Sequence, residues 1–271
     1  MNGRKKTILR LALALLLLAA VTAAGWLCGE KAGITDFSNK NLAPGWEHPF
    51  GTDWMGRDML SRTLVGLSLS IRLGLCTAAV SALLALLLGL AAALLGKKVD
   101  SVITFLIDMV MGIPHILLLI LISFAFGKGF AGVAAGVALT HWPSLARLIR
   151  GEVLQLKESE YILTAGKLGV SPWQIALQHM LPHLLPQLLV GLLMTFPHAI
   201  LHEASITFLG FGLSGEQPAI GLILSESMRY LITGKWWLTV LPGAMLVMVA
   251  AVFDLAGKAL RSALDPFSVQ E

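Results

Sequence analysis

The sequence has 271 residues, of which 56% are hydrophobic and only 13% are charged, with a formal net charge of +4. A typical soluble domain carries about a quarter charged residues, and several apolar runs here exceed the ~18 residues that a transmembrane helix needs. These features exclude a soluble enzyme or a soluble ATPase domain, and we expect an all-α polytopic membrane protein. The small positive charge is typical of Lys and Arg in cytoplasmic loops, not of nucleic-acid binding, so no nucleic-acid partner is expected.

The first apolar run, residues 8–27, is preceded or opened by Lys5, Lys6 and Arg10. Basic residues flanking a first span place the N-terminus in the cytoplasm. A signal peptide cleaved after Ala23 is the alternative, but the run is long for the apolar part of a signal peptide. We therefore expect an uncleaved first span.

Residues 28–67 are polar and rich in turn-forming residues. Their most patterned part contains glycines, acidic residues and arginines at regular spacing: Gly51, Thr52, Asp53, Gly56, Arg57, Asp58, Ser61 and Arg62. From the residues alone, this pattern predicts an extracytoplasmic amphipathic helix whose Arg57 and Arg62 side chains snorkel at the membrane surface.

Five further apolar runs predict five further spans, and the total is about six transmembrane helices. They cover residues 68–95, 102–126, 130–149, 184–208 and 237–260. The first two of these are joined by a short basic loop, which we expect in the cytoplasm. Six spans place both termini and residues 158–183 on the cytoplasmic side of the membrane.

The longest polar interruption in the second half of the chain is residues 160–182. Residues 160–168 predict a short helix that Gly169 ends, as glycine does after a helix C-terminus. Ser171 then caps a second helix that has Pro172 at its first position. A helix–glycine–helix hairpin leaves backbone groups unpaired and cannot lie in lipid, so it projects into water or packs against protein.

Histidines in the apolar runs suggest metal binding. His198 and His202 are four residues apart and therefore share one face of a helix. Two imidazoles at this spacing can reach one divalent transition metal, and Glu203 is a candidate third ligand. His141, beside Trp142, is a weaker candidate, and histidines that only pack at a helix interface are the alternative.

Two stretches resemble one family of transporters. Residues 51–62 resemble a segment of ABC importer permeases of the dipeptide/oligopeptide/nickel branch, and the similarity continues less closely to Arg72. Residues 160–182 resemble the cytoplasmic coupling loop of such permeases, with Ala165, Gly169 and the Leu181-Pro182 pair at the family's spacing. The chain departs from that loop at Leu163, Thr164 and His179, where the family has Glu, Ala and a hydrophobic residue.

The resemblance implies a type I ABC importer permease fold with a cytoplasmic coupling helix. Residues 1–67 would form an N-terminal span with an extracytoplasmic amphipathic segment, and residues 68–271 the core permease domain with the coupling stretch at 158–183. The chain would be a transport subunit and not an enzyme. The resemblance assigns these residues to ATPase coupling: Glu160, Ala165, Gly169, Leu181 and Pro182.

The same resemblance implies partners. These are a second homologous permease, two ATP-binding subunits and an extracytoplasmic solute-binding protein. The chain itself would bind no cofactor, because ATP and Mg²⁺ would be held by the ATP-binding subunits in the cytoplasm.

The His198–His202 spacing is similar to a segment of nickel permeases, so we expect nickel or a related transition metal as solute, free or chelated. A di- or oligopeptide is the alternative. A channel or an ion-coupled secondary transporter is less favoured, because the sequence shows neither inverted repeats nor charged residues near the middle of the spans.

Overall fold

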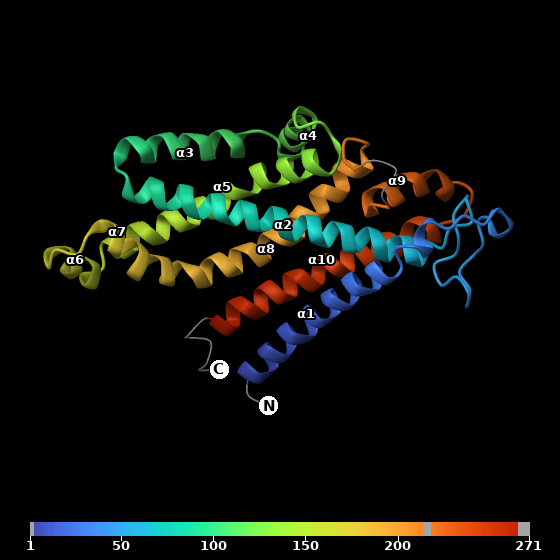
Figure 1. Cartoon of the computed structure of the whole chain (residues 1–271), viewed down its shortest axis with the longest axis horizontal. Helices are drawn as coiled ribbons and strands as arrows, with labels where there is room; N and C mark the ends of the chain where they lie inside the picture. Colours follow the sequence, from blue (N-terminus) through green and yellow to red (C-terminus); the bar gives the residue numbers. More distant parts are fainter. Residues whose placement is uncertain (1–2, 214–217, 265–271) are drawn as a thin grey trace.

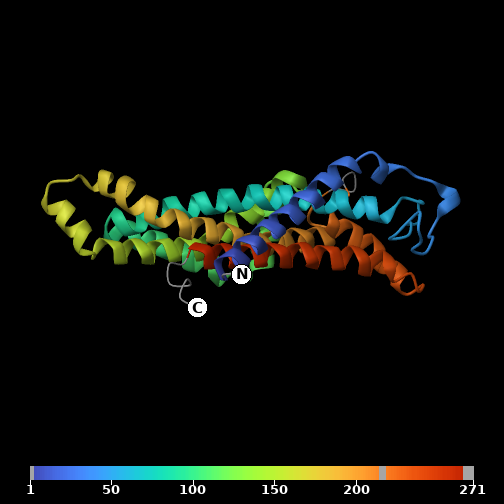
Figure 2. The ribbon, with the colours of Figure 1, turned by 90° about the horizontal axis from the view of Figure 1, so that it is seen from below.

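The computed structural model describes residues 3–213 and 218–264, which form an elongated helical bundle (Figure 1). The helices are α1 (Gly3–Leu27), α2 (Met59–Leu94), α3 (Lys97–Gly112), α4 (His115–Ala125), α5 (Gly129–Lys157), α6 (Glu160–Lys167), α7 (Pro172–Ile175), α8 (Leu181–Phe208), α9 (Ile220–Leu231) and α10 (Trp237–Leu264). The all-α prediction is confirmed. Helices α6 and α7 lie at one end of the bundle and residues 28–58 at the other, which Figure 2 shows from a second side.

Four helical stretches are long and apolar enough to cross a membrane: Lys5–Leu27, Met59–Leu94, Pro172–Phe208 and Trp237–Leu264. Helices α3 and α4 together make a fifth, but they meet at a bend of 102°. The bend lies before Pro114, which lacks a backbone N–H and disfavours helical geometry in the residue before it. The predicted fourth span, α5, has 29 residues but does not meet the same criterion; Arg147, Arg150, Glu152 and Lys157 lie in its second half.

Helix α2 is the centre of the bundle and packs against α1, α5 and α8. Small residues permit the close approach to α5: a side chain at Gly89 would place its Cβ 2.9 Å from the Ala146 carbonyl oxygen. Small residues play this part in membrane helices because lipid supplies no hydrophobic driving force, so close van der Waals contact stabilises the packing. On the other side of α2, Phe196 of α8 stacks on Phe253 of α10, with ring centroids 3.4 Å apart.

Residues 48–58 do not form the predicted amphipathic helix. They form turns, held by Asp53, whose carboxylate accepts hydrogen bonds from the backbone N–H groups of Met55 (2.8 Å) and Arg57 (3.0 Å). Helix α2 begins at Met59, where the Asp58 side chain caps it by accepting from the Ser61 N–H at 2.8 Å. The expected domain boundary between residues 67 and 68 therefore falls inside α2.

The two arginines of this segment are paired and do not snorkel. The Arg57 Nε donates to Asp53 at 2.7 Å, and a terminal nitrogen of Arg62 donates to the same carboxylate at 2.6 Å. The other terminal nitrogen of Arg62 donates to Glu226 of α9 at 3.1 Å. The network connects the 28–58 segment to α9. The Arg62 side chain is only 4% exposed.

The hairpin at the opposite end forms as predicted. Helix α6 ends at Lys167, and Gly169 has φ +83°, a left-handed conformation that glycine adopts readily. Ser171 caps α7 by accepting from the Gln174 N–H, and the Gln174 side chain accepts from the Ser171 N–H in return. After α7 the chain continues through a π turn, η3 (Ala176–Met180), directly into α8. The fifth span thus starts as one helix at Pro172 and not at residue 184.

Candidate functional site

Three histidines from three helices meet inside the bundle. His115 is the first residue of α4, His141 lies in α5, and His202 lies in α8. Each offers one ligand nitrogen, and these nitrogens all lie within 4.8 Å of one another. The bend between α3 and α4 positions His115. The chain leaves helical geometry just before Pro114, and α4 then begins at His115 and packs against α5. We call these three residues the histidine cluster.

Hydrogen bonding fixes the tautomer of His141. Its Nδ1 lies 2.8 Å from the Val137 carbonyl oxygen, which can only accept, so Nδ1 carries the hydrogen. The lone pair of Nε2 then faces the cluster, where His202 Nδ1 lies 3.2 Å away. An imidazole that donates from one nitrogen to a carbonyl and presents the other is the usual arrangement of a metal-binding histidine.

The cluster geometry suits a transition metal. Nitrogens bound tetrahedrally at about 2.0–2.1 Å from one ion lie roughly 3.3 Å from each other, close to the 3.2 Å between His141 Nε2 and His202 Nδ1. His141 is buried, whereas His115 and His202 are half-buried, so one side of the cluster is accessible. Three imidazoles leave a fourth coordination position open for a solute or water.

The structure brings together only part of the predicted ligand set. His202 and the weaker candidate His141 come together, while His198, one turn before His202, is exposed and is not in the group. His115 was not among the predicted ligands. Its position after a helix-breaking proline is a local feature, but the sequence does not show which distant helix it meets.

Glu203 faces away from the histidine cluster. Its side chain is fully buried against α2, where the Ser70 hydroxyl donates to it at 2.6 Å, and Thr207 donates to its other oxygen at 3.1 Å. Successive residues of an α-helix point about 100° apart, so Glu203 and His202 occupy different faces of α8. The buried carboxyl group joins α8 to α2 and is not placed to ligate a metal with His202.

The predicted coupling residues lie along the hairpin and do not form one compact site. Glu160 and Ala165 line a shallow cleft on α6, and Gly169 is at the tip. Leu181 and Pro182 form the start of α8, after the π turn. Large apolar side chains near the tip are exposed, Leu168 by 79% and Trp173 by 72%.

Comparison with known proteins identifies the family to which this chain belongs. Residues 85–267 match the family model described as "Binding-protein-dependent transport system inner membrane component". The chain is 35% identical over 263 residues to a putative peptide transport system permease protein of Brucella suis, covering 97% of this chain and 88% of the relative. It is 30% identical over 229 residues to the dipeptide transport system permease protein DppC of Bacillus subtilis, covering 84% and 72%.

A third relative is the oligopeptide transport system permease protein OppC of Bacillus subtilis, 31% identical over 232 residues, with 86% of this chain and 76% of the relative covered. Among solved structures, the fold is similar to a chain of the MetNI methionine ABC transporter in an inward-facing conformation. The TM-score is 0.62 at 18% identity, with 76% of this chain and 98% of that chain covered. Together with the family match over residues 85–267, these similarities show that the chain belongs to the inner-membrane permease family of binding-protein-dependent ABC importers.

Proposed function

We propose that this chain is a permease subunit of an ATP-driven importer of di- or oligopeptides. The observation that carries this proposal is the similarity to relatives named as peptide permeases over nearly the full chain, including a probable D,D-dipeptide permease of Escherichia coli that covers 98% of it. The proposal reverses the preference for nickel that the histidine spacing suggested, because none of these relatives is named for a metal.

The importer would need further subunits. A second permease, two ATP-binding subunits and a solute-binding protein would complete it, with both termini and the α6–α7 hairpin in the cytoplasm. The hairpin supports an ATPase-facing role, because Leu168 and Trp173 expose large apolar surfaces at the end of the bundle. Clustered apolar surface of this kind is typical of a contact with a partner protein. Glu160, Ala165 and Gly169 would shape the docking surface, and Leu181-Pro182 would connect it to α8.

A second candidate solute is a transition metal or a small metal chelate. The histidine cluster supports it, since three imidazoles with an open fourth position could bind such an ion weakly enough to release it. The set that supports this candidate is His115, His141 and His202, whereas the sequence pattern suggested His198, His202 and Glu203.

The test is solute-stimulated ATP hydrolysis by the complete transporter, purified with its partner subunits and reconstituted in liposomes with its solute-binding protein. A mixture of di- and tripeptides is expected to raise the ATPase rate and to be taken up, while Ni²⁺ without peptide is not. Stimulation by Ni²⁺ and not by peptides would favour the metal candidate. No response to either solute would contradict both.

A further inference from the structure

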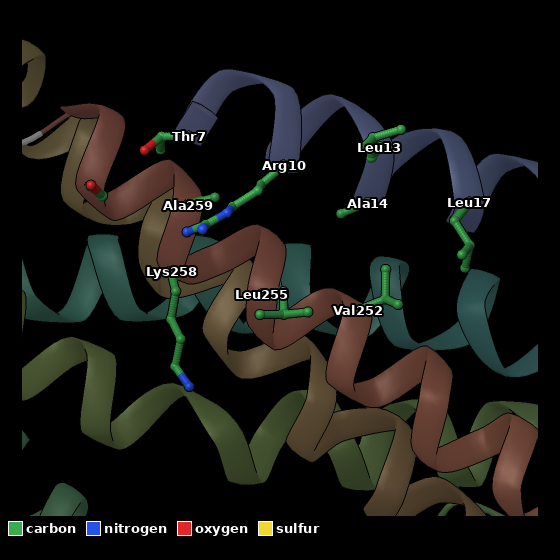
Figure 3. Close-up of a pocket in the computed structure, with 10 residues that line it drawn as sticks. Thr7, Arg10, Leu13, Ala14, Leu17, Val252, Leu255, Lys258 and Ala259 are labelled. Carbon is green, nitrogen blue, oxygen red and sulfur yellow. The ribbon is translucent and has the colours of Figure 1, made fainter. Parts of the chain in front are cut away.

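A groove of about 540 Å³ runs between the first and last helices, α1 and α10 (Figure 3). Its α1 wall consists of residues on one face of the helix, from Thr7 to Leu17, and its α10 wall runs from Val252 to Ser262. Helix α1 packs mainly on α2 and α10 and lies at one edge of the bundle (Figure 1). The groove therefore opens at the surface of this bundle, where lipid or another protein can contact it.

The lining of the groove changes from polar to apolar along its length. Helices α1 and α10 run in opposite directions, so Thr7 and Arg10 lie at the same end as Ala259, whereas Leu17 and Val252 lie toward the other end. Arg10 and Leu17 are separated by about 10 Å along the helix. A phospholipid has the same order, with a phosphate at one end and apolar chains beyond it.

Arg10 supplies the positive charge of this groove. Its exposed side chain reaches toward Ala259 of α10 (Figure 3), and within residues 3–213 and 218–264 no carboxylate forms a salt bridge with it. The other basic lining residue, Lys258, is paired with Asp254 at 2.6 Å and contributes mainly its apolar stem. A guanidinium suits phosphate because it donates two parallel hydrogen bonds in a plane.

We propose that this groove binds an anionic phospholipid of the cytoplasmic leaflet, with the phosphate on Arg10 and an acyl chain along Leu13 and Leu17. The leaflet assignment rests on the orientation proposed above, in which the N-terminus is cytoplasmic. That leaflet carries negatively charged lipids, and basic pockets between membrane helices on this side select their headgroups. Lys5 and Lys6, exposed on the same end of α1, add a less specific attraction.

The experiment measures the phospholipid that remains bound to the complete transporter. The purified complex is stripped with detergent, incubated with vesicles of phosphatidylglycerol or of phosphatidylcholine, purified again and analysed by native mass spectrometry. The wild type is expected to retain phosphatidylglycerol in preference to phosphatidylcholine. Arg10→Gln is expected to lower phosphatidylglycerol affinity about fivefold, while Lys6→Gln, the matched control outside the groove, has a smaller effect.

A second variant tests the groove without changing a charge. Leu13→Trp narrows the groove at a side chain that is 58% exposed, so α1 packing is preserved. It is expected to reduce retained phosphatidylglycerol while Arg10 is intact. Equal losses of retained phosphatidylglycerol in Arg10→Gln and Lys6→Gln would overturn the site. Unchanged retention in Arg10→Gln, or in Leu13→Trp, would also overturn it. So would efficient photocrosslinking from a photoreactive amino acid at position 13 to the second permease, because a protein would then fill the groove. Peptide uptake can fail independently of all these outcomes, which separates this proposal from the proposed function.

Discussion

His141 Nε2 and His202 Nδ1 lie 3.2 Å apart, although 61 residues separate them in the chain. The contact fixes how α5 faces α8, because His141 is also held by Val137 one turn earlier. With His115 joining from α4, this polar cluster connects three helices, apart from the buried Glu203 that joins α8 to α2. Polar groups inside a bundle of membrane helices are retained at a cost in stability and often mark a solute path.

The histidine cluster is expected to bind a transition metal in the purified complex. Titration with Co²⁺ should give the visible absorption of a tetrahedral site, and His141→Ala or His202→Ala should weaken binding at least about tenfold, as loss of a ligand does. His198→Ala is the matched control, because it removes an exposed imidazole of the same helix. If His198→Ala weakens Co²⁺ binding as much as His202→Ala, the assignment of ligands is wrong.

Glycine is expected to be required at position 169 and not at position 166. Gly169 has φ +83°, so Gly169→Ala strains the hairpin by roughly 1–2 kcal/mol. Gly166 has open space around it and no positive φ, so Gly166→Ala is tolerated. We expect Gly169→Ala to insert normally but to recover less ATP-binding subunit on co-purification, or to hydrolyse ATP without uptake. Equal behaviour of the two variants would show that the hairpin shape is unimportant for coupling.

The ion pairs of the 28–58 segment are expected to stabilise it unequally. Arg62 is 4% exposed and contacts both Asp53 and Glu226, so Arg62→Ala leaves a buried carboxylate short of a partner and costs about 3 kcal/mol. Arg57 is more exposed, at 17%, and Arg57→Ala should cost less. Limited proteolysis within residues 28–58 is the measurement. Faster cleavage in Arg57→Ala than in Arg62→Ala would contradict the order.

The orientation of the chain predicts opposite labelling of its two ends. In a background without Cys28 and Cys76, Gly45→Cys should react with a membrane-impermeant maleimide added outside intact cells or spheroplasts. Lys167→Cys should react only after the membrane is opened, because the hairpin faces the cytoplasm in this orientation. Labelling of both positions from the same side would refute the orientation.

The hairpin at residues 160–182 was predictable because its shape depends on local rules. A glycine with positive φ and a serine cap act within a few residues, so their pattern is visible in the sequence. The histidine cluster was only half predictable. Helical spacing predicted that His198 and His202 share a face, but the choice between them depends on where α4 and α5 pack, and that contact is long-range.

In the 28–58 segment the sequence pattern predicted the wrong local structure. The spacing of Arg57 and Arg62 is compatible with an amphipathic helix, but Arg57 lies outside any helix, between a turn and Asp58, which forms an isolated β-bridge with Thr52. Gly56 has φ +75°, and a Cβ there would lie 1.7 Å from the Asp36 carbonyl oxygen, so a tight backbone contact replaces the helix. The burial of Asp53 is a tertiary property that hydrophobic periodicity does not report.

The continuous helical stretch from Pro172 to Phe208 has a mechanical consequence. Its 37 residues make it about 55 Å long, and it carries His202 near the end opposite to α7. A rod of this length that tilts by about 5° around one end displaces the other end by roughly 5 Å. A small rotation imposed at the hairpin is therefore enough to separate His202 from His141. Pro186 and Pro197 interrupt the hydrogen bonding of this rod, so it bends most easily there. Stiffness at these two prolines would determine how much of the tilt reaches the histidines.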